Sequence, residues 1–406
     1  MLPAEKVKEN PDSLIRHNNI TLISTAIIYG RNASGKSNLF KAILALQLMV
    51  LYSSDNKVDE KIKEYRPFKL DRNNSSLPVE FSIEFIAPDG LRYSYEIQFT
   101  GKEILKENLY FFPKNQRAKL FERKFGNPIS FGNHVKGRKK DIEELLYSNQ
   151  LLLSKIMKDK LEALIPPLNF FRYKMFLPET VKIGNDVFIS HFSKLLGKDS
   201  KPKLAKNLNK LLRFADTGIQ SLNISERKKS DFKVPEEVPE DVKENFYENF
   251  RFRIDTQHTV YENSMEVGKS LFNIKEESDG TQKLLAVGGC IIEALMDGQV
   301  ILIDEFDQSL HPQLTQALIK LFHSKELNPN NAQLVVTSHD VSLLNSECFR
   351  RDQIWFAEKE FQGNSYYYSI SNIKGIRANI PYEHWYLKGK FGATPVFNYL
   401  ELDLEL

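Results

Sequence analysis

The chain has 406 residues, of which 41% are apolar and 27% charged, as is usual for a globular protein with two or three subdomains. Its net charge of +3, from 56 basic and 53 acidic residues, is nearly balanced, so composition alone does not indicate a nucleic-acid partner. Cys290 and Cys348 form no disulfide framework, which predicts a reducing, cytoplasmic location, and no apolar stretch or secretory signal points to a membrane.

The first informative stretch, Gly30 to Ser37, reads GRNASGKS and fits the phosphate-binding pattern G-x-x-x-x-G-K-[ST] at every fixed position. Residues 25–29 before it are apolar and β-prone, and residues 37–46 after it have helical spacing without a breaker. A strand, a glycine-rich turn and a helix in this order are the context that the motif requires. The plain alternative is a glycine turn before any helix, and it is disfavoured because further nucleotide motifs follow.

The chemistry of this loop predicts a site for ATP and Mg²⁺. Gly30 and Gly35 allow the backbone to approach an anion, and the freed N–H groups point at phosphate from the start of the helix. Lys36 is expected to reach the β- and γ-phosphates and to act in catalysis, and the hydroxyl of Ser37 to bind the metal ion. The predicted nucleotide contacts are Gly30, Arg31, Asn32, Ala33, Ser34, Gly35, Lys36, Ser37 and Asn38.

A first lobe is predicted over residues 1–125. Residues 1–20 are polar and are expected to form a loop before the first strand. Residues 79–85 and 91–99 alternate apolar and polar around a Pro-Asp-Gly turn, which predicts an antiparallel hairpin. Residues 107–112 and 119–123 are expected to extend it into a β-meander.

The middle of the chain, residues 126–262, is predicted to be a helical insertion. Helical spacing occurs over 136–164, around 192–196 and over 204–214, and Pro166-Pro167 is expected to break the first of these runs. No sustained heptad is present, so a long coiled-coil arm is not expected. Three basic clusters lie near residues 136–140, 201–213 and 227–229. They could bind nucleic-acid phosphates, but the favoured interpretation is that they are solvent-exposed faces of helices.

A second lobe is predicted over residues 263–406. A near-continuous apolar run from Val300 ends in Asp304 and Glu305, as in a central parallel strand with carboxylates at its end. Asp304 is placed to hold Mg²⁺, and Glu305 to polarise the attacking water as a general base. Residues 333–337 form a second buried strand, followed by His339, which is placed to sense the γ-phosphate. A strand-end histidine is otherwise usually structural.

A further motif precedes a long apolar helix predicted over residues 281–296. Ser278, Asp279 and Gly280 stand at its N-terminus, where they offer an anion site, although an ordinary helix cap is the plainer reading. The motif is distant in sequence from the acidic strand, so it does not easily serve the phosphate held by Lys36 of its own chain. Two copies arranged head to tail would bring each motif onto the ATP of the other.

With these motifs in order, the chain resembles the ABC-type ATPase heads of the SMC/RecF/OLD group. It is more similar still to a bacterial and archaeal set of AAA-named ATP-binding proteins often found in defence or abortive-infection loci. The stretches that carry the resemblance are AIIYGRNASGKSNL, YRPFKLD, RFADTGI, ESDGTQKL, LIDEFDQSLHP, TSHD, RRDQIWFAEK and YLKGKFGATP.

The resemblance implies an α/β P-loop NTPase built as an ABC-type ATPase head, with an antiparallel β-meander lobe and a helical insertion. It also implies ATP hydrolysis, a homodimer or larger homo-oligomer, a role in antiviral defence and a partner protein from the same locus. The chain departs from the family pattern in three places. An N-F-R-S-F-like motif is absent before Gly30, no clear glutamine loop follows (Gln47 and residues 65–68 are the candidates), and His311 replaces an aspartate of the dimer-facing loop.

Four functions are compatible with these motifs to different degrees. The favoured one is an ATP-driven dimerisation switch whose state is read by the insertion or by a partner. A DNA-binding ATPase of repair or recombination is the alternative, which the basic clusters permit. A nuclease of the OLD type is less favoured, because no strand-end pair of carboxylates follows His339. A transporter subunit is disfavoured by the large insertion.

Overall fold

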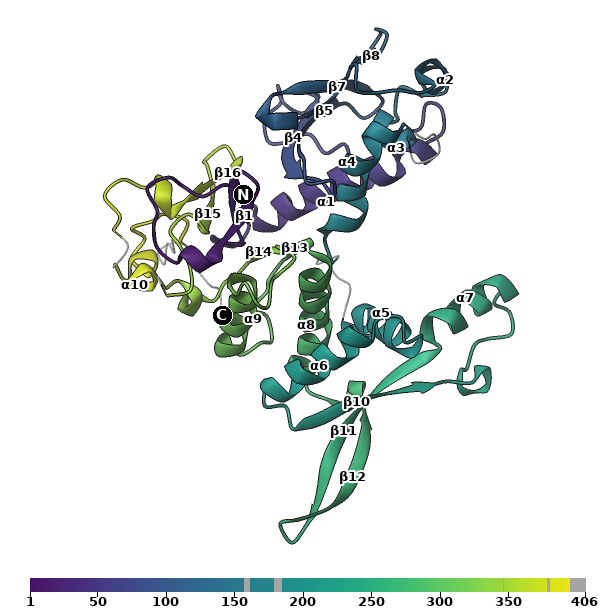
Figure 1. Ribbon diagram of the computed structural model, residues 1–406, viewed down its shortest axis with the longest axis vertical. Helices are drawn as coiled ribbons and strands as arrows, with labels where there is room; N and C mark the ends of the chain where they lie inside the picture. The colour runs from purple at the N-terminus through teal and green to yellow at the C-terminus, as the bar shows by residue number, and fades with distance from the viewer. Residues whose placement is uncertain (157–160, 179–184, 346, 378–379, 395–406) are drawn as a thin grey trace, which may run out of the picture.

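Six strands form a mixed sheet at the centre of the computed structural model, which describes residues 1–156, 161–178, 185–345, 347–377 and 380–394 (Figure 1). The strand order is β16-β15-β3-β14-β13-β9, and every neighbouring pair is parallel except β15 and β16. The strands are β3 (Thr25–Tyr29), β9 (Met175–Phe176), β13 (Val300–Ile303), β14 (Gln333–Thr337), β15 (Ile354–Lys359) and β16 (Ser365–Ser369).

The three strands predicted to position the site are neighbours in this sheet. All five residues of β3 are buried, and β13 and β14 lie beside it in parallel register, with Leu334 opposite Thr25 and Ile303 opposite Val336. Because parallel strands end at the same edge, the loops after β3, β13 and β14 meet there. The predicted α/β fold class of a P-loop NTPase is confirmed.

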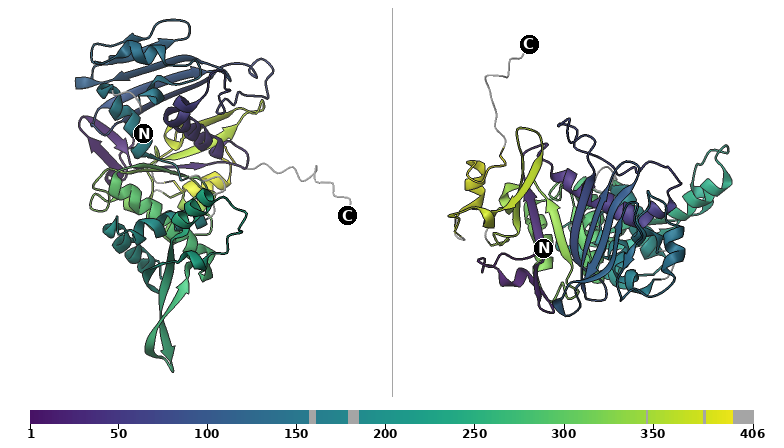
Figure 2. Two further views of the ribbon diagram at one scale, coloured as in Figure 1. Left: turned by 90° about the vertical axis from the view of Figure 1, so that its right-hand side faces the viewer. Right: turned by 90° about the horizontal axis from the view of Figure 1, so that it is seen from above.

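Helices cover both faces of the central sheet (Figures 1 and 2). On one face lie α8 (Asp279–Asp297), close to the position predicted for it, and α9 (Pro312–His323), and α1 (Lys36–Tyr52) crosses the other face. The middle of α8 is almost entirely buried, and its Gly288 and Gly289 leave room for Leu211 and Phe192, which a Cβ would approach to 2.4 Å. Helix α8 therefore anchors the insertion to the sheet.

The predicted β-meander is confirmed as a five-stranded antiparallel sheet stacked beyond α1. Its buried Glu107 accepts hydrogen bonds from Tyr95 Oη (2.9 Å) and Arg123 Nη1 (3.3 Å), and from the backbone N–H groups of Leu152 and Leu153. The strands are β4 (Val79–Ile86), β5 (Arg92–Phe99), β6 (Ile104–Phe111), β7 (Ala118–Lys124) and β8 (Ser130–Phe131). One charged residue thus ties this sheet to the helices that follow it.

The segment 126–262 carries helices but is not purely helical, which corrects the prediction. Two strands within it pair with a third beyond residue 262, in the order β10-β11-β12, so the expected boundary at 262/263 falls inside a hairpin. The strands are β10 (Ile219–Glu226), β11 (Phe252–Glu262) and β12 (Met265–Asn273). The helices are α2 (Lys139–Glu144), α3 (Leu152–Lys155), α4 (Ile165–Asn169), α5 (Asn185–Gly197), α6 (Pro202–Phe214) and α7 (Glu240–Phe250).

Two further predictions need correction. Pro166 and Pro167 do not break a helix but stand in the first turn of α4, where a missing N–H costs nothing. Residues 1–20, expected as a loop, include β1 (Leu14–His17) and part of β2 (Ile20–Ile23), which pair antiparallel.

The C-terminal part of the described chain ends near α10 (Tyr382–Leu387). Residues 395–406 of the predicted second lobe lie outside the described residues. Within the described ranges, none of the helices combines the length and the apolar character that a bilayer span requires.

Candidate nucleotide-binding site

The phosphate loop has the backbone that its sequence predicts. Gly35 has φ +109°, in the region that favours glycine, and Ala33 has φ +61°. Helix α1 begins at Lys36, directly after this turn, so its first N–H groups face the end of β3. A helix N-terminus of this kind attracts phosphate by its free N–H groups and by its dipole.

Lys36 is folded back over its own loop. Its side chain is 6% exposed, and Nζ donates hydrogen bonds to the backbone oxygens of Gly30 (2.7 Å) and Arg31 (3.3 Å). Burial lowers the pKa of Lys36, while the carboxylates of Asp304, Glu305 and Asp307 act in the opposite direction. The lysine and the acidic loop therefore lie within electrostatic reach of each other.

The hairpin β15–β16 packs against the phosphate loop and makes hydrogen bonds with it. Tyr367 Oη donates to the backbone oxygen of Gly35 at 2.8 Å, and Arg31 Nη2 donates to the backbone oxygen of Lys359 at 3.2 Å. A Cβ on Gly35 would lie 2.4 Å from Ser365 Oγ, so only glycine fits against this hairpin.

Asp304 and Glu305 follow β13 and are fixed by one threonine of the neighbouring strand. The buried Thr337, at the end of β14, donates its hydroxyl to Asp304 Oδ1 (2.5 Å) and accepts from Glu305 N (2.8 Å). Glu305 has φ +49°, an uncommon conformation for this residue type, and its side chain is exposed. The side chain of Glu305 thus lies outside the sheet interior, and that of Asp304 is half-buried at the end of β13.

Asp307 and His339 connect the same two loops. The backbone N–H of His339 lies 3.3 Å from both carboxylate oxygens of Asp307, and the imidazole of His339 is exposed. The structure therefore brings Lys36, Asp304, Glu305 and His339 to one edge of the sheet, as the sequence predicted, without testing the chemical role of each.

The donor set fits a bound nucleoside triphosphate with its metal ion. Ser34 Oγ is buried in the loop and has no hydrogen-bond partner among the described residues, so it remains free to donate to a phosphate. Ser37 and Asp304 supply a hydroxyl and a carboxylate, which suits a Mg²⁺ ion that takes its other ligands from phosphate and water. No three His, Cys, Asp or Glu side chains gather into a metal site of their own in the described ranges.

Ser278 caps α8 as the plainer reading predicted, because its Oγ accepts from Thr281 N at 3.2 Å. Ser278 and Asp279 are exposed, and no hydrogen bond joins the predicted anion motif to the phosphate loop in the part of the chain that the structure describes. A Cβ on Gly280 would lie 3.0 Å from Ser309 O, so the motif packs on the loop after β13. One turn further along α8, burial lowers the pKa of Lys283, while the carboxylates of Glu305 and Asp307 act to raise it.

Two residues singled out by the family resemblance have structural contacts. Gln47 lies within α1, and its Nε2 donates to the backbone oxygens of Phe171 (2.7 Å) and Met175 (2.8 Å). His311 caps α9, since its Nδ1 accepts from Gln313 N at 3.3 Å.

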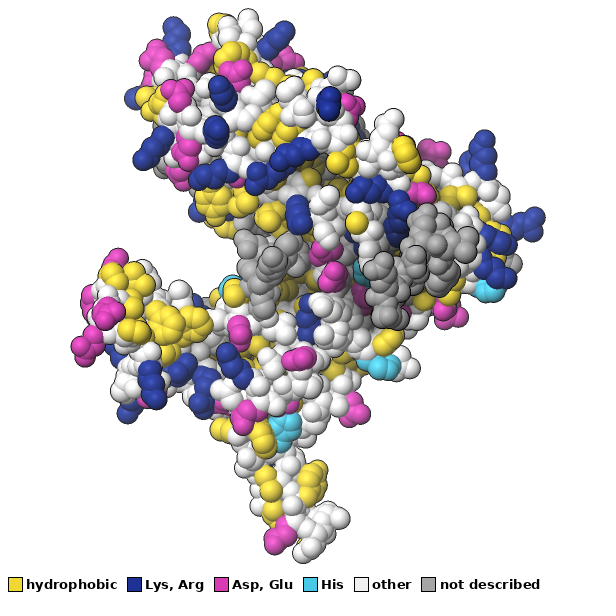
Figure 3. All heavy atoms as spheres, turned by 180° about the vertical axis from the view of Figure 1, so that it is seen from behind, with side chains coloured by type: hydrophobic (Ala, Val, Ile, Leu, Met, Phe, Trp, Pro, Cys, Tyr) yellow, Lys and Arg dark blue, Asp and Glu magenta, His cyan; other side chains and the backbone are white. Residues whose placement is uncertain are grey.

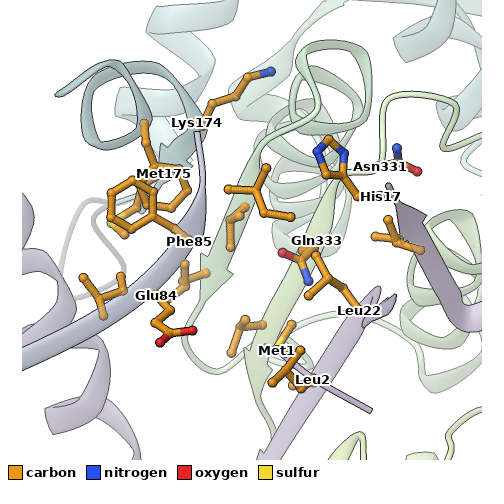
Figure 4. A pocket seen from close by; sticks show the side chains of 18 of the residues that line it. Met1, Leu2, His17, Leu22, Glu84, Phe85, Lys174, Met175, Asn331 and Gln333 are labelled. Atoms are coloured by element: carbon orange, nitrogen blue, oxygen red, sulfur yellow. The ribbon is translucent and has the colours of Figure 1, made fainter. Parts of the chain in front are cut away.

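A cavity of about 740 Å³ lies beside α1, between the β-meander, the β1–β2 hairpin and the central sheet (Figure 4). Mostly apolar residues line it, and two of its polar side chains already make hydrogen bonds, His17 Nε2 with Gly90 O (2.9 Å) and Gln333 Nε2 with Ile23 O (2.7 Å). None of the predicted nucleotide contacts lines this cavity. It is therefore distinct from the phosphate site.

Four site residues were not predicted from the sequence: Thr337, Asp307, Lys283 and Tyr367. Thr337 and Asp307 stand in TSHD and LIDEFDQSLHP, two stretches that carry the family resemblance. Their place in these stretches is the signal by which they could have been identified as site residues. Tyr367 carries no such signal, because it is far from the phosphate loop in sequence.

Comparison with known proteins gives the family. The sequence matches the family described as "AAA domain, putative AbiEii toxin, Type IV TA system" over residues 26–345. The chain belongs to this family. It is thus an AAA-domain protein of the abortive-infection kind, and the matched range includes the phosphate loop, the acidic strand and His339.

The solved structures that match this chain are only distantly similar to it in geometry. An SMC head bound to the C-terminal winged-helix domain of ScpA has 16% identity and a TM-score of 0.38, over 88% of this chain and 94% of that one. A Pyrococcus furiosus SMC head with an extended coiled coil, bound to the C-terminal domain of ScpA, has 13% identity and a TM-score of 0.42, over 87% and 92%. No curated protein matches the sequence significantly. The family assignment rests on the family match alone.

Proposed function

We propose that this AAA-domain protein hydrolyses ATP and works as a nucleotide-driven dimerisation switch. Within an anti-phage or abortive-infection system it would be the sensor or motor subunit, acting on a partner protein from the same locus in the cytoplasm. The main support for the proposal is that the acidic loop after β13 and the phosphate loop lie at the same edge of the sheet. Thr337 holds Asp304 and Glu305 at the sheet edge where Lys36 and the phosphate loop lie.

Each residue has a role that follows from its chemistry. Lys36 and the loop N–H groups would bind the phosphates, and Ser37 and Asp304 would hold Mg²⁺, which neutralises phosphate charge when bound. Glu305 would accept a proton from the attacking water at its carboxylate. His339 would donate a hydrogen bond to the γ-phosphate and so distinguish ATP from ADP.

Dimerisation is proposed because the anion motif of α8 is exposed and is not hydrogen-bonded to the phosphate loop of its own chain. Ser278, Asp279 and Gly280 would instead close over the ATP of a second copy, which completes each site. Binding of ATP would then favour the closed dimer, and hydrolysis would release it.

Nucleic-acid binding is not proposed as a second function, because two of the basic clusters are partly neutralised within the chain. Lys201 pairs with Glu293 (2.7 Å) and Asp297 (2.9 Å), and Lys229 pairs with Glu244.

The test is the solution mass of the wild type and of Glu305→Gln, with and without ATP and Mg²⁺, measured alongside phosphate release. We expect Glu305→Gln to bind ATP, to lose turnover and to accumulate as a dimer or larger assembly. Turnover that is equal without the Glu305 carboxylate, or a mass that never changes with ATP, would contradict the proposal. The Lys36→Ala variant is the control, since it should lose both binding and association.

A further inference from the structure

The sheet of the insertion ends in a free-standing ribbon. Strand β10 pairs with β11 only as far as His258, and beyond it Thr259–Glu262 pair with β12 alone. Apolar side chains on this ribbon are exposed, among them Tyr261 and Met265, and Figure 3 shows the ribbon projecting from the molecule. An isolated pair of strands is only marginally stable in water, so the contacts at its base fix its position.

The base of the ribbon is attached to a single carboxylate. Thr256 and His258 are two residues apart on β11, so both side chains lie on the same face of the strand. The Thr256 hydroxyl donates to Glu277 Oε1, and His258 Nε2 lies 2.7 Å from the same oxygen. The ring of Phe272 packs edge-on against the imidazole of His258, with ring centres 5.2 Å apart, which orients the imidazole for this contact.

Glu277 directly precedes Ser278, the cap of α8 and the first residue of the anion motif. Its backbone oxygen accepts from Gln282 Nε2 at 2.9 Å, so the residue is fixed to α8 by its backbone and to β11 by its side chain. The side chain of Glu277 is only 13% exposed. A displacement of β11 relative to α8 must therefore move the backbone that leads into Ser278.

We propose that Glu277 is a positioning residue that sets the conformation of Ser278–Gly280 according to the position of the β10–β12 sheet. This inference rests on the proposed function, because it assumes that Ser278–Gly280 close over the ATP of a second copy. The insertion would then influence dimerisation through this carboxylate, without touching the nucleotide.

The test compares Glu277→Ala and Glu277→Gln with the matched control Glu262→Ala, which removes an exposed carboxylate from the free part of the same ribbon. Four quantities are measured: the dimer dissociation constant with ATP and Mg²⁺ in the Glu305→Gln background, kcat and KM for ATP without that substitution, and the affinity of the monomer for a non-hydrolysable ATP analogue. Thr256→Val provides a second variant, because it removes one donor and leaves Glu277 in place.

Hydrogen bonds to a charged group are strong, so we expect Glu277→Ala to weaken the dimer and to lower kcat about tenfold, and Thr256→Val to do so less. Gln can still accept both bonds, so Glu277→Gln should recover part of the loss. The affinity of the monomer for the analogue should change less than about twofold in every variant, because no hydrogen bond in the described residues joins Glu277 to the phosphate loop. Glu262→Ala should match the wild type.

Equal loss of monomer affinity in Glu277→Ala and Thr256→Val would show a general structural defect and overturn the proposal. So would dimer affinity and kcat that equal those of the wild type. If the wild type itself neither dimerises with ATP nor turns it over, the proposed function fails and the role of Glu277 falls with it. If the wild type does both and the Glu277 variants behave like it, the proposed function is retained and the role of Glu277 is refuted.

Discussion

Replacing Thr337 by valine tests whether one hydroxyl organises both carboxylates of the site. Valine keeps the shape of the buried threonine but removes the donor to Asp304 Oδ1 and the acceptor for Glu305 N. The lost bond to a charged group and the unpaired N–H together should lower the free energy of unfolding by about 3 kcal/mol. A displacement of the carboxylates by about 1 Å should lower kcat roughly a hundredfold.

The assay is phosphate release over a range of ATP concentrations, with chemical unfolding of each variant in parallel. We expect KM for Thr337→Val to stay within about threefold of the wild type, since the phosphate loop is unchanged. Thr337→Ser is the matched control, because serine keeps the hydroxyl and loses only a methyl group, worth about 1 kcal/mol of stability. Wild-type turnover in the valine variant, or an equal loss of turnover in the serine variant, would refute the role of the hydroxyl.

Three further predictions follow from particular contacts. Gly35→Ala should weaken ATP binding at least about tenfold, because the positive φ and the contact with Ser365 both oppose a side chain, and titration with a fluorescent ATP analogue measures this. Burial lowers the pKa of His323 from 6.5 to about 4. The unfolded chain therefore binds the extra proton first, so stability should fall by up to about 3 kcal/mol as the pH drops from 6.5 to 4, and His323→Gln should flatten thermal melts over that range. Removing the buried carboxylate in Glu107→Ala should cost about 3 kcal/mol or more in urea unfolding, because it removes the acceptor of four hydrogen bonds, whereas the exposed Glu84→Ala should change stability by less than about 0.5 kcal/mol.

The sequence was sufficient where local pattern and spacing decide the structure. The strand, loop and helix around Lys36, the acids after β13 and the meander hairpins were all predictable, because each depends on residues adjacent in the chain. The position of Asp304 near Lys36 also followed, since parallel strands end at one edge of a sheet.

The strands of the insertion were not predicted, because the apolar alternation in them is short and gives way to polar residues. Strand β11 carries Arg253, Asp255, Gln257 and His258, and its neighbour β12 exposes most of its apolar residues. The contacts of Thr337 and Glu277 were missed for another reason. Each joins segments separated in sequence, and only the packed structure shows which side chains meet.

The support of the phosphate loop by β15–β16 has a consequence for how the protein is made. Strand β3 leaves the ribosome well before β15, one of its two neighbours in the sheet, because most of the described chain lies between them. At roughly 5–20 residues per second, tens of seconds separate their synthesis. Until then the loop lacks the backing of Tyr367 and Ser365. A nascent or prematurely terminated chain that lacks β15–β16 would carry the complete phosphate motif without its ordered form, so the competence to bind ATP would arise only after this hairpin has been made.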